Sequence, residues 1–205
     1  MAQQKESSLF NMVATLVVIT LISGFALAYV NQLTQEPIHQ AQLAKKKEAL
    51  VEVLPKFDNN PIDTRYAVFV EALGDSVEVF KAYQSGELVG TAVNAFSPNG
   101  YSGDVRLMVG FLPDGTVYAV SVLQQTETPG LGTKMTEADF KNQFTDKNPK
   151  NFKMQVVKDG GQIDAITAAT ISSRAFCDAL QTAYAVCMDS CDANTGATSK
   201  DEQDY

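Results

Sequence analysis

The stretch VRLMVGFLPDGTVYAVSVLQ, residues 105–124, decides the fold class of this chain. Two runs of β-branched and apolar residues, 105–112 and 116–124, flank the tripeptide Pro113-Asp114-Gly115. Short runs of this kind on both sides of a tight turn are typical of a β-hairpin. We therefore predict two antiparallel strands joined at the Pro-Asp-Gly turn.

More strands are predicted on both sides of this hairpin. Residues 77–83 and 88–96 are rich in β-branched and aromatic side chains, which favours two further strands. A second hairpin is predicted with its turn at 158–161, between strands at 153–157 and 162–165.

Two helices are predicted in the second half of the chain, at 136–144 and 173–188. In the second helix, apolar residues recur at steps of three or four, which is the spacing of one helix face: Phe176, Leu180, Ala183 and Cys187. Strands and helices together predict an α+β domain with an antiparallel sheet.

An uncharged apolar segment lies near the N-terminus, at residues 9–30. As a helix it would span about 33 Å, at ~1.5 Å per residue, which is enough to cross a bilayer core. A cleaved signal peptide is the alternative, because Ala26-Leu27-Ala28 resembles a small-residue cleavage site. The run is longer than the usual core of a signal peptide, which favours an uncleaved transmembrane anchor.

These segments divide the chain into five parts. A short tail, residues 1–8, precedes the transmembrane helix at 9–30, and a membrane-proximal helical stalk is expected at 31–56. The folded domain is predicted at 57–188, and the polar, acidic residues 189–205 are expected to form a flexible tail.

Charge and composition exclude several functions. A net charge of −8 disfavours nucleic acid as a partner. One histidine, and three cysteines without a Cys-x-x-Cys pair, are too few for a histidine-built metal site, a four-cysteine cluster or a c-type haem. Any redox chemistry must come from an organic cofactor. Cys177 and Cys187 are expected to be small buried residues of the last helix, although a Cys187–Cys191 disulfide is conceivable.

The segment DAITAATISS, residues 164–173, places hydroxyl side chains on a turn of small residues directly before the last predicted helix. Ser172 or Ser173 is a candidate N-cap. Thr170 lies at the helix entrance, where unpaired N–H groups and the helix dipole favour an anionic phosphate. An ordinary helix cap is the competing interpretation.

Two glycine-rich stretches, 99–103 and 126–134, could join this turn in one site. In the second, Pro129 to Gly132 forces a tight irregular loop whose backbone polar groups could meet a planar polar ligand, and Lys134 could reach an anion. Neither stretch fits the dinucleotide fingerprint or the P-loop. Taken alone, each is also explained as a structural turn.

Three motifs in fixed order carry a family resemblance: GYSGDVRLMVGF at 100–111, TETPGLGTKM at 126–135 and DAITAATISSRAF at 164–176. Together with the N-terminal anchor, they make nearly the whole chain resemble the flavin-binding G subunit of Rnf-type ion-translocating electron transport complexes. The C subunit of sodium-translocating NADH:quinone reductase shares the flavin domain and is one alternative. A cofactor-free, membrane-anchored assembly module is another.

The resemblance implies an electron-transfer subunit that relays electrons through FMN in a ferredoxin:NAD oxidoreductase coupled to ion translocation. In the family, a flavin transferase joins the FMN phosphate to a threonine of the pattern Asp-x-x-Ser/Thr-Gly-Ala-Thr. Here the acceptor would be Thr170, with Asp164 and Thr167 in the recognition motif. The partners implied are the other subunits of the complex and the lipid bilayer, with the soluble domain on the periplasmic side of the bacterial cytoplasmic membrane.

The candidate cofactor-binding residues come from the threonine turn and from the TPGLG loop, which would line the isoalloxazine ring. They are Asp164, Thr167, Ala168, Ala169, Thr170, Ser172, Ser173, Glu127, Thr128, Leu131, Gly132, Thr133 and Lys134.

The chain departs from the family pattern at Ala168, where the pattern has glycine. A second copy at 192–199 matches the pattern better and makes Thr198 a rival acceptor. Thr170 is favoured because Thr198 is followed by an acidic tail with no apolar helix. Alanine at 168 is compatible with flavin attachment if the turn has a negative φ there.

Overall fold

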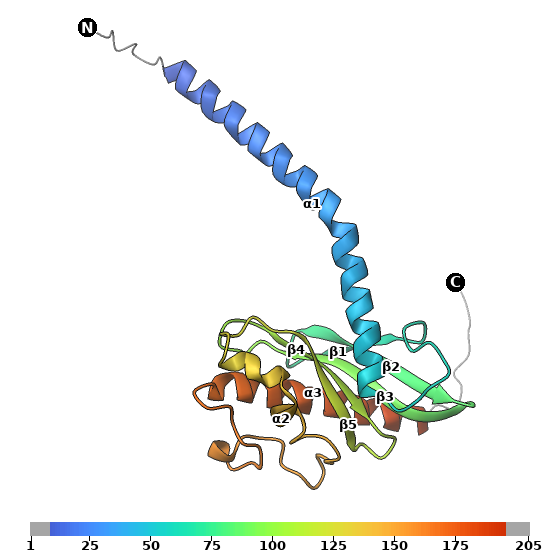
Figure 1. Ribbon diagram of the computed structural model, residues 1–205. Helices are drawn as coiled ribbons and strands as arrows, with labels where there is room; N and C mark the ends of the chain where they lie inside the picture. Colours follow the sequence, from blue (N-terminus) through green and yellow to red (C-terminus); the bar gives the residue numbers. More distant parts are fainter. Residues whose placement is uncertain (1–8, 196–205) are drawn as a thin grey trace. The chain divides into compact units, whose positions relative to one another are not determined.

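The computed structural model describes residues 9–195, with residues 190–195 described by their backbone alone. The chain divides into two compact units, and the boundary falls after Ala44. The first unit is helical, and the second is an antiparallel sheet with helices (Figure 1). This confirms the predicted α+β class with a long apolar helix near the N-terminus.

The first helix, α1, runs from Leu9 to Val53 without a break. Its most apolar window has a mean hydropathy of 2.3, so α1 is long and apolar enough to cross a membrane by length and composition. The sequence predicted a membrane span and a separate stalk in this region. The structure has one helix across both, with Pro37 inside it.

Five antiparallel strands form one sheet in the order of the chain, with the bounds β1 Tyr66–Val70, β2 Asp75–Gln84, β3 Glu87–Ser97, β4 Val105–Phe111 and β5 Val117–Gln124. The four strands predicted between residues 77 and 124 are all present. The predicted turn is confirmed as well, since Leu112 N–H donates to Thr116 O at 2.8 Å across it. Only β1 was missed, because it is a short edge strand directly after a loop.

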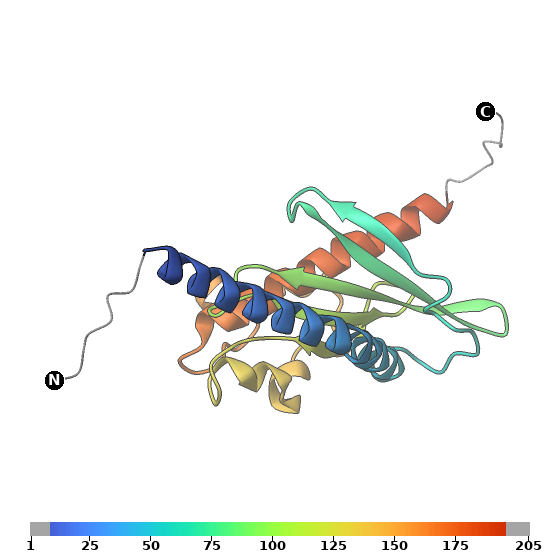
Figure 2. The same cartoon turned by 90° about the horizontal axis from the view of Figure 1, so that it is seen from above.

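One face of the sheet packs against α3, which runs from Thr170 to Thr195 (Figures 1 and 2). Large aliphatic side chains line this face. A row of four buried valines crosses it from β2 to β5, each opposite the next: Val79, Val93, Val109 and Val120. The apolar side of α3 covers them with Phe176, Leu180 and Ala183, as the helix pattern predicted.

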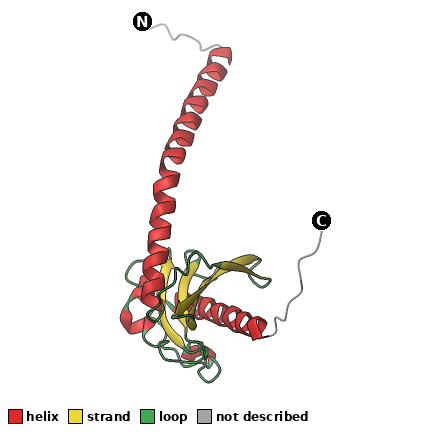
Figure 3. Ribbon diagram, turned by 90° about the vertical axis from the view of Figure 1, so that its right-hand side faces the viewer, coloured by secondary structure: helices red, strands yellow, loops and turns green. Residues whose placement is uncertain are grey.

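The opposite face packs against the end of α1 and is lined by small residues (Figure 3). Ala92, Gly110 and Ala119 lie opposite one another on β3, β4 and β5. The α1 backbone comes so close that a Cβ on Gly110 would lie 1.6 Å from the carbonyl oxygen of Val53. This smaller core also buries Leu50, Leu54, Phe80 and Met108.

Polar side chains tie the end of α1 to the sheet around this smaller core. Lys46 forms an ion pair with Glu78. Burial alone raises the pKa of Glu78, but the hydrogen bonds from Lys46 and Asn94 outweigh it, and the pKa is lowered. The second unit begins at Lys45, so the domain start predicted at residue 57 is too late.

Three aromatic rings fix α3 to the segment that follows the sheet. The centroids of Phe140, Phe144 and Phe176 lie 4.9–5.5 Å apart. The helix predicted at 136–144 is shorter than expected, because the chain forms η1 (Gly132–Thr136) and then one turn, α2 (Ala138–Lys141). The tight turns bring both Phe140 and Phe144 onto Phe176.

The hairpin predicted around 158–161 is wrong. The segment contains a 3-10 turn, η2 (Val157–Asp159), and a single parallel bridge between Val156 and Ile163. The chain folds back too sharply for an antiparallel ladder, because a Cβ on Gly161 would already lie 2.0 Å from the carbonyl oxygen of Gln155.

Helix α3 continues to Thr195, so the tail predicted from residue 189 begins too early. Thr198 and the rest of 196–205 lie outside the described residues.

Cys177 and Cys187 are buried, as predicted, and burial raises the pKa of the Cys177 thiol to about 12. The side chain of Cys191 lies outside the described part, and with it the conceivable disulfide.

Candidate functional site

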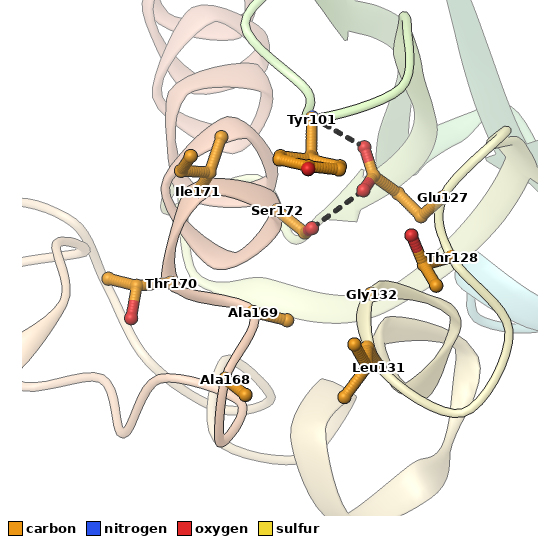
Figure 4. A pocket seen from close by; sticks show the side chains of 10 residues that line it. All are labelled: Tyr101, Glu127, Thr128, Leu131, Gly132, Ala168, Ala169, Thr170, Ile171 and Ser172. Carbon is orange, nitrogen blue, oxygen red and sulfur yellow. Dashed lines mark hydrogen bonds between the residues drawn. The ribbon is translucent and has the colours of Figure 1, made fainter.

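The start of α3 borders a pocket of about 530 Å³ (Figure 4). Ligand pockets are typically about 300–1,000 Å³ in volume, so this one is large enough for a cofactor. Its lining comes from the loop before β4, the loop after β5 and the turn that leads into α3. The lining residues are Tyr101, Glu127, Thr128, Leu131, Gly132, Ala168, Ala169, Thr170, Ile171 and Ser172.

Thr170 is the first residue of α3 and lies at one edge of the pocket (Figure 4). Ser173 N–H closes a helical bond to the carbonyl oxygen of Ala169 at 3.0 Å. The N–H groups that precede the first helical bond are those a helix leaves for an outside acceptor. The positive end of the helix dipole also lies at Thr170. A phosphate joined to this threonine would therefore be stabilised.

The two serines predicted as the N-cap have other partners. Ser173 is buried, and its Oγ accepts from Ile166 N–H at 2.9 Å and donates to Ala169 O at 3.0 Å. Ser172 Oγ donates to the carboxylate of Glu127 at 2.7 Å. Because both hydroxyls face inward from positions inside α3, the N-cap prediction is wrong.

Ala168 adopts a left-handed backbone conformation, with φ of 60°. The condition set for alanine at this position, a negative φ, is therefore not met. In this region an L-residue brings its Cβ close to the following carbonyl oxygen, whereas glycine adopts the conformation freely. The backbone thus explains why glycine occupies this place in the family pattern, and why alanine here is strained.

Glu127 is a buried carboxylate at the back of the pocket, with only 5% of its surface exposed. Its Oε1 accepts from the N–H groups of Tyr101 at 2.8 Å and Ser102 at 3.3 Å, and its Oε2 accepts from Ser172 (Figure 4). All three partners donate, so both carboxylate oxygens have hydrogen-bond donors. Glu127 thereby joins all three segments that line the pocket.

Two glycines leave room for this carboxylate. A Cβ on Gly132 would lie 2.6 Å from Glu127 Cβ and 2.7 Å from Ser172 Oγ. A Cβ on Gly100 would lie 2.0 Å from Gly103 O and 2.7 Å from Glu127 Oε1. Both glycine-rich stretches are therefore sterically required by the packing around Glu127, and together they shape the pocket.

The remaining candidate residues lie around the pocket but do not line it. Thr133 Oγ1 accepts from Gly130 N–H at 2.9 Å and holds the TPGLG loop closed. Lys134 is exposed on η1, and Thr167 is exposed on the turn before α3. Asp164 is exposed too, and its backbone N–H donates to Gln143 at 2.8 Å.

Three residues at the site were not singled out from the sequence. Tyr101 and Ile171 line the pocket and are 68% and 47% exposed. Lys158 donates to the hydroxyl of Thr170 at 3.5 Å. Tyr101 stands inside a glycine motif that was recognised, so its aromatic ring was the available signal. Lys158 was hidden because its turn was interpreted as a hairpin.

These residues fit FMN. Tyr101, Leu131 and Ile171 offer apolar surface at the pocket rim for a planar ring system. Gly132, which packs without a Cβ against Glu127 and Ser172, lines the pocket with its backbone. Thr170 is at the start of a long helix, and helix starts of this kind can stabilise a phosphate.

Comparison with known proteins gives the following similarities. Residues 100–185 match the FMN-binding domain family. The chain is 35% identical over 164 residues to the G subunit of the ion-translocating oxidoreductase complex of Salmonella typhimurium, covering 76% of this chain and 80% of the relative. It is 34% identical over 176 residues to the G subunit of the same complex in Erwinia tasmaniensis, covering 82% and 84%. The crystal structure of Shewanella oneidensis NqrC is 24% identical, with a TM-score of 0.47 over 58% of this chain and 62% of that one.

Proposed function

Because this chain belongs to the family of G subunits of ion-translocating oxidoreductase complexes, we propose that it relays electrons through FMN joined covalently to Thr170. Family membership makes the chain an electron-transfer flavoprotein subunit of a translocase and confirms the resemblance to Rnf-type G subunits. The covalent bond, its site and the side of the membrane are the proposed parts.

The observation that carries the proposal is the position of Thr170. Its hydroxyl stands at the first residue of a 26-residue helix and at the edge of the one pocket that the three motifs build among the described residues. A phosphodiester keeps a negative charge, which the helix N-terminus stabilises. The covalent tether would keep the flavin in place while electrons pass through it.

The remaining pocket residues would position the flavin. Tyr101, Leu131 and Ile171 would contact its ring system, and Glu127 would hold the surrounding loops in one arrangement. When bound, FMN supplies the capacity to take up and pass on electrons. Thr133 and Lys134 on η1, and Asp164 and Thr167 in the recognition motif, would act outside the pocket, where the flavin transferase can reach exposed side chains.

The partners proposed are the other subunits of the complex, the flavin transferase that installs FMN, and the lipid bilayer that α1 would cross. We place the soluble domain on the periplasmic side of the cytoplasmic membrane. Protease added to intact spheroplasts should digest the domain that begins at Lys45. Protection in intact spheroplasts, with digestion only after lysis, would place the domain on the cytoplasmic side.

The attachment site is tested by coexpression of the full chain with a flavin transferase, followed by in-gel ultraviolet fluorescence of the denatured protein. The wild type and Thr198→Val should fluoresce, and Thr170→Val should not. The reverse pattern for the two variants would move the site to Thr198. A non-fluorescent wild type would argue against covalent flavin altogether.

A further inference from the structure

A sharply folded turn lies beside Thr170 and carries Lys158. It runs from Val156 to Ile163, and Val157 N–H donates to Ile163 O at 2.9 Å to close it. Gly160 has a φ of 79°, and Gly161 has no room for a Cβ. The backbone of this turn is therefore fixed in shape, and so is the direction from which its residues approach α3.

An ion pair holds the turn against α3. Arg174 donates from Nε to Asp159 Oδ2 and from Nη2 to Asp159 Oδ1, both at 2.7 Å. Two parallel bonds between a guanidinium and a carboxylate fix orientation as well as distance. The Arg174 guanidinium also holds the pKa of Asp159 below its ordinary value. Arg174 lies four residues after Thr170, so the pair fastens the turn to the first helical turn of α3.

Lys158 is the residue that this arrangement brings to Thr170. Its Nζ lies 3.5 Å from Thr170 Oγ1. None of the ion pairs within residues 9–189 involves Lys158. Its ammonium group is exposed, and its hydrogen-bond acceptor is a neutral hydroxyl. An anionic group attached at Thr170 would be a stronger acceptor for the same ammonium group.

We propose that Lys158 binds the phosphate group at Thr170, both while the bond to that threonine forms and afterwards, and that the Asp159–Arg174 pair positions Lys158 for it. This inference rests on the proposed function. In the transfer, Thr170 Oγ forms a bond to the FMN phosphorus of FAD and loses its proton to a base of the transferase. The pyrophosphate bond breaks, and AMP leaves with the electron pair. One negative charge remains on the phosphodiester, within reach of Lys158.

The turn offers a matched control. Lys153 Nζ would lie 3.7 Å from a Cβ on Gly160, so it is a second exposed lysine beside the same turn. It has the same charge as Lys158, but no hydrogen bond between Lys153 Nζ and Thr170 is recorded among the described residues. A nonspecific effect of positive charge on the transferase would therefore appear in both lysine variants, whereas phosphate binding would appear only at Lys158.

The experiment uses the full chain, purified without flavin, as the substrate of a purified flavin transferase with FAD. Intact mass spectrometry follows the fraction of chains that carry the adduct at several chain concentrations. Lys158→Ala should lower kcat for attachment about tenfold or more, because a charge-assisted contact to the transferred phosphate is lost. The kcat of Lys158→Arg should stay within about threefold of the wild-type value. The kcat of Lys153→Ala should equal the wild-type value.

The positioning pair has its own prediction. Arg174→Ala should lower kcat by a smaller factor than Lys158→Ala. The double variant, Lys158→Ala with Arg174→Ala, should be no slower than Lys158→Ala alone, because both residues act through the contact of Lys158 with the phosphate. Thermal unfolding of each apo variant reports whether it is folded. If Lys158→Ala does not fold, Lys158→Arg against Lys158→Gln tests the charge at this position instead, because both substitutions keep a polar side chain there.

Two results would overturn the role of Lys158 while leaving the proposed function intact. One is a Lys158→Ala chain that is modified at Thr170 as fast as the wild type. The other is a change in KM alone, which would mean that Lys158 docks the transferase. Failure of the proposed function is distinct, because the wild-type chain would then gain no adduct at Thr170 in the same assay.

Discussion

The two faces of the sheet bind their helices in opposite ways. Beneath α3, a row of valines from Val79 to Val120 provides bulk, and the helix packs on side chains. Beneath the end of α1, the row from Ala92 to Ala119 provides none, and the helix backbone reaches the sheet at Gly110. The start of α3 borders the candidate cofactor pocket, and the opposite face packs against the end of α1.

This difference indicates which changes each face tolerates. Side chains that interdigitate can repack when one is exchanged for another of similar volume. A backbone seated on a glycine has no such freedom, because any added atom meets a carbonyl group. A single sheet lies between α3 and the end of α1.

The largest effect is expected when the α1 face is uncovered. A chain that begins at Lys45 should fold, whereas one that begins at Phe57 should show no cooperative thermal transition. The second lacks the buried side chains of Leu50, Val53 and Leu54. Their loss removes about 5–9 kcal/mol of burial free energy, which is comparable to the whole stability of a small domain. Equal melting curves for the two fragments would mean that α1 is not part of the core.

Gly110→Ala tests the backbone contact on the same face. Its Cβ would lie 1.6 Å from Val53 O, so the helix must move, and we expect a loss of about 3 kcal/mol or more in unfolding free energy. Val109→Ala, the next residue and on the α3 face, should lose about 2 kcal/mol because it leaves a cavity. Urea unfolding of the chain from Lys45 measures both. A Gly110→Ala chain as stable as the wild type would contradict the close contact.

The contrast also explains what could be predicted from the sequence. The strands at 77–124 follow from their runs of β-branched and aromatic residues, and the apolar face of the last helix follows from its spacing of three to four residues. The role of α1 in the core did not follow, because Leu50 and Val53 belong to a cluster whose sheet residues lie on β2, β3 and β4, far away in the sequence. The available sign was the nearly continuous apolar run of β4, VRLMVGF, because a strand covered on both faces does not alternate apolar and polar residues.

At the site, the three motifs predicted which loops meet but not how their side chains pair. Eight of the thirteen candidate residues line the pocket. The pairing of Glu127 with Ser172, and the approach of Lys158 to Thr170, depend on tertiary contacts that no local spacing encodes. The positive φ of Ala168 could have been predicted, because glycine at this place in the family pattern is itself a sign of a left-handed backbone.

A smaller effect, with the opposite sign, is expected on the α3 face at Ala168. Ala168→Gly should raise the unfolding free energy by about 1 kcal/mol, because glycine adopts a φ of 60° without strain. Ala169→Gly is the matched control and should lower stability, since Ala169 is buried and no positive φ is recorded there. The thermal midpoints of the two apo chains decide it, and destabilisation by Ala168→Gly would speak against the left-handed turn.

The smallest effect concerns the ion pair between Lys46, near the end of α1, and Glu78 on β2. The lowered pKa of Glu78 means that its contribution is present above the ordinary value of 4.5 and is lost as the pH falls through the folded-state pKa. Glu78→Gln should therefore be less stable than the wild type at pH 7, by about 1 kcal/mol or less, and equally stable in acid well below pH 4.5. Glu48→Gln, at an exposed position on α1, is the control. A Glu78→Gln deficit that persists unchanged in acid would contradict this assignment.

Peptide mass spectrometry of the chain purified from its native membrane tests the central claim most directly. Digestion should yield a peptide that contains Thr170 with the added mass of FMN less one water, fragmentation should place the adduct on that threonine, and the peptide that contains Thr198 should be unmodified. An adduct on Thr198, or an unmodified Thr170 in a chain that carries no flavin, would contradict the account of α3 as the helix that holds the cofactor.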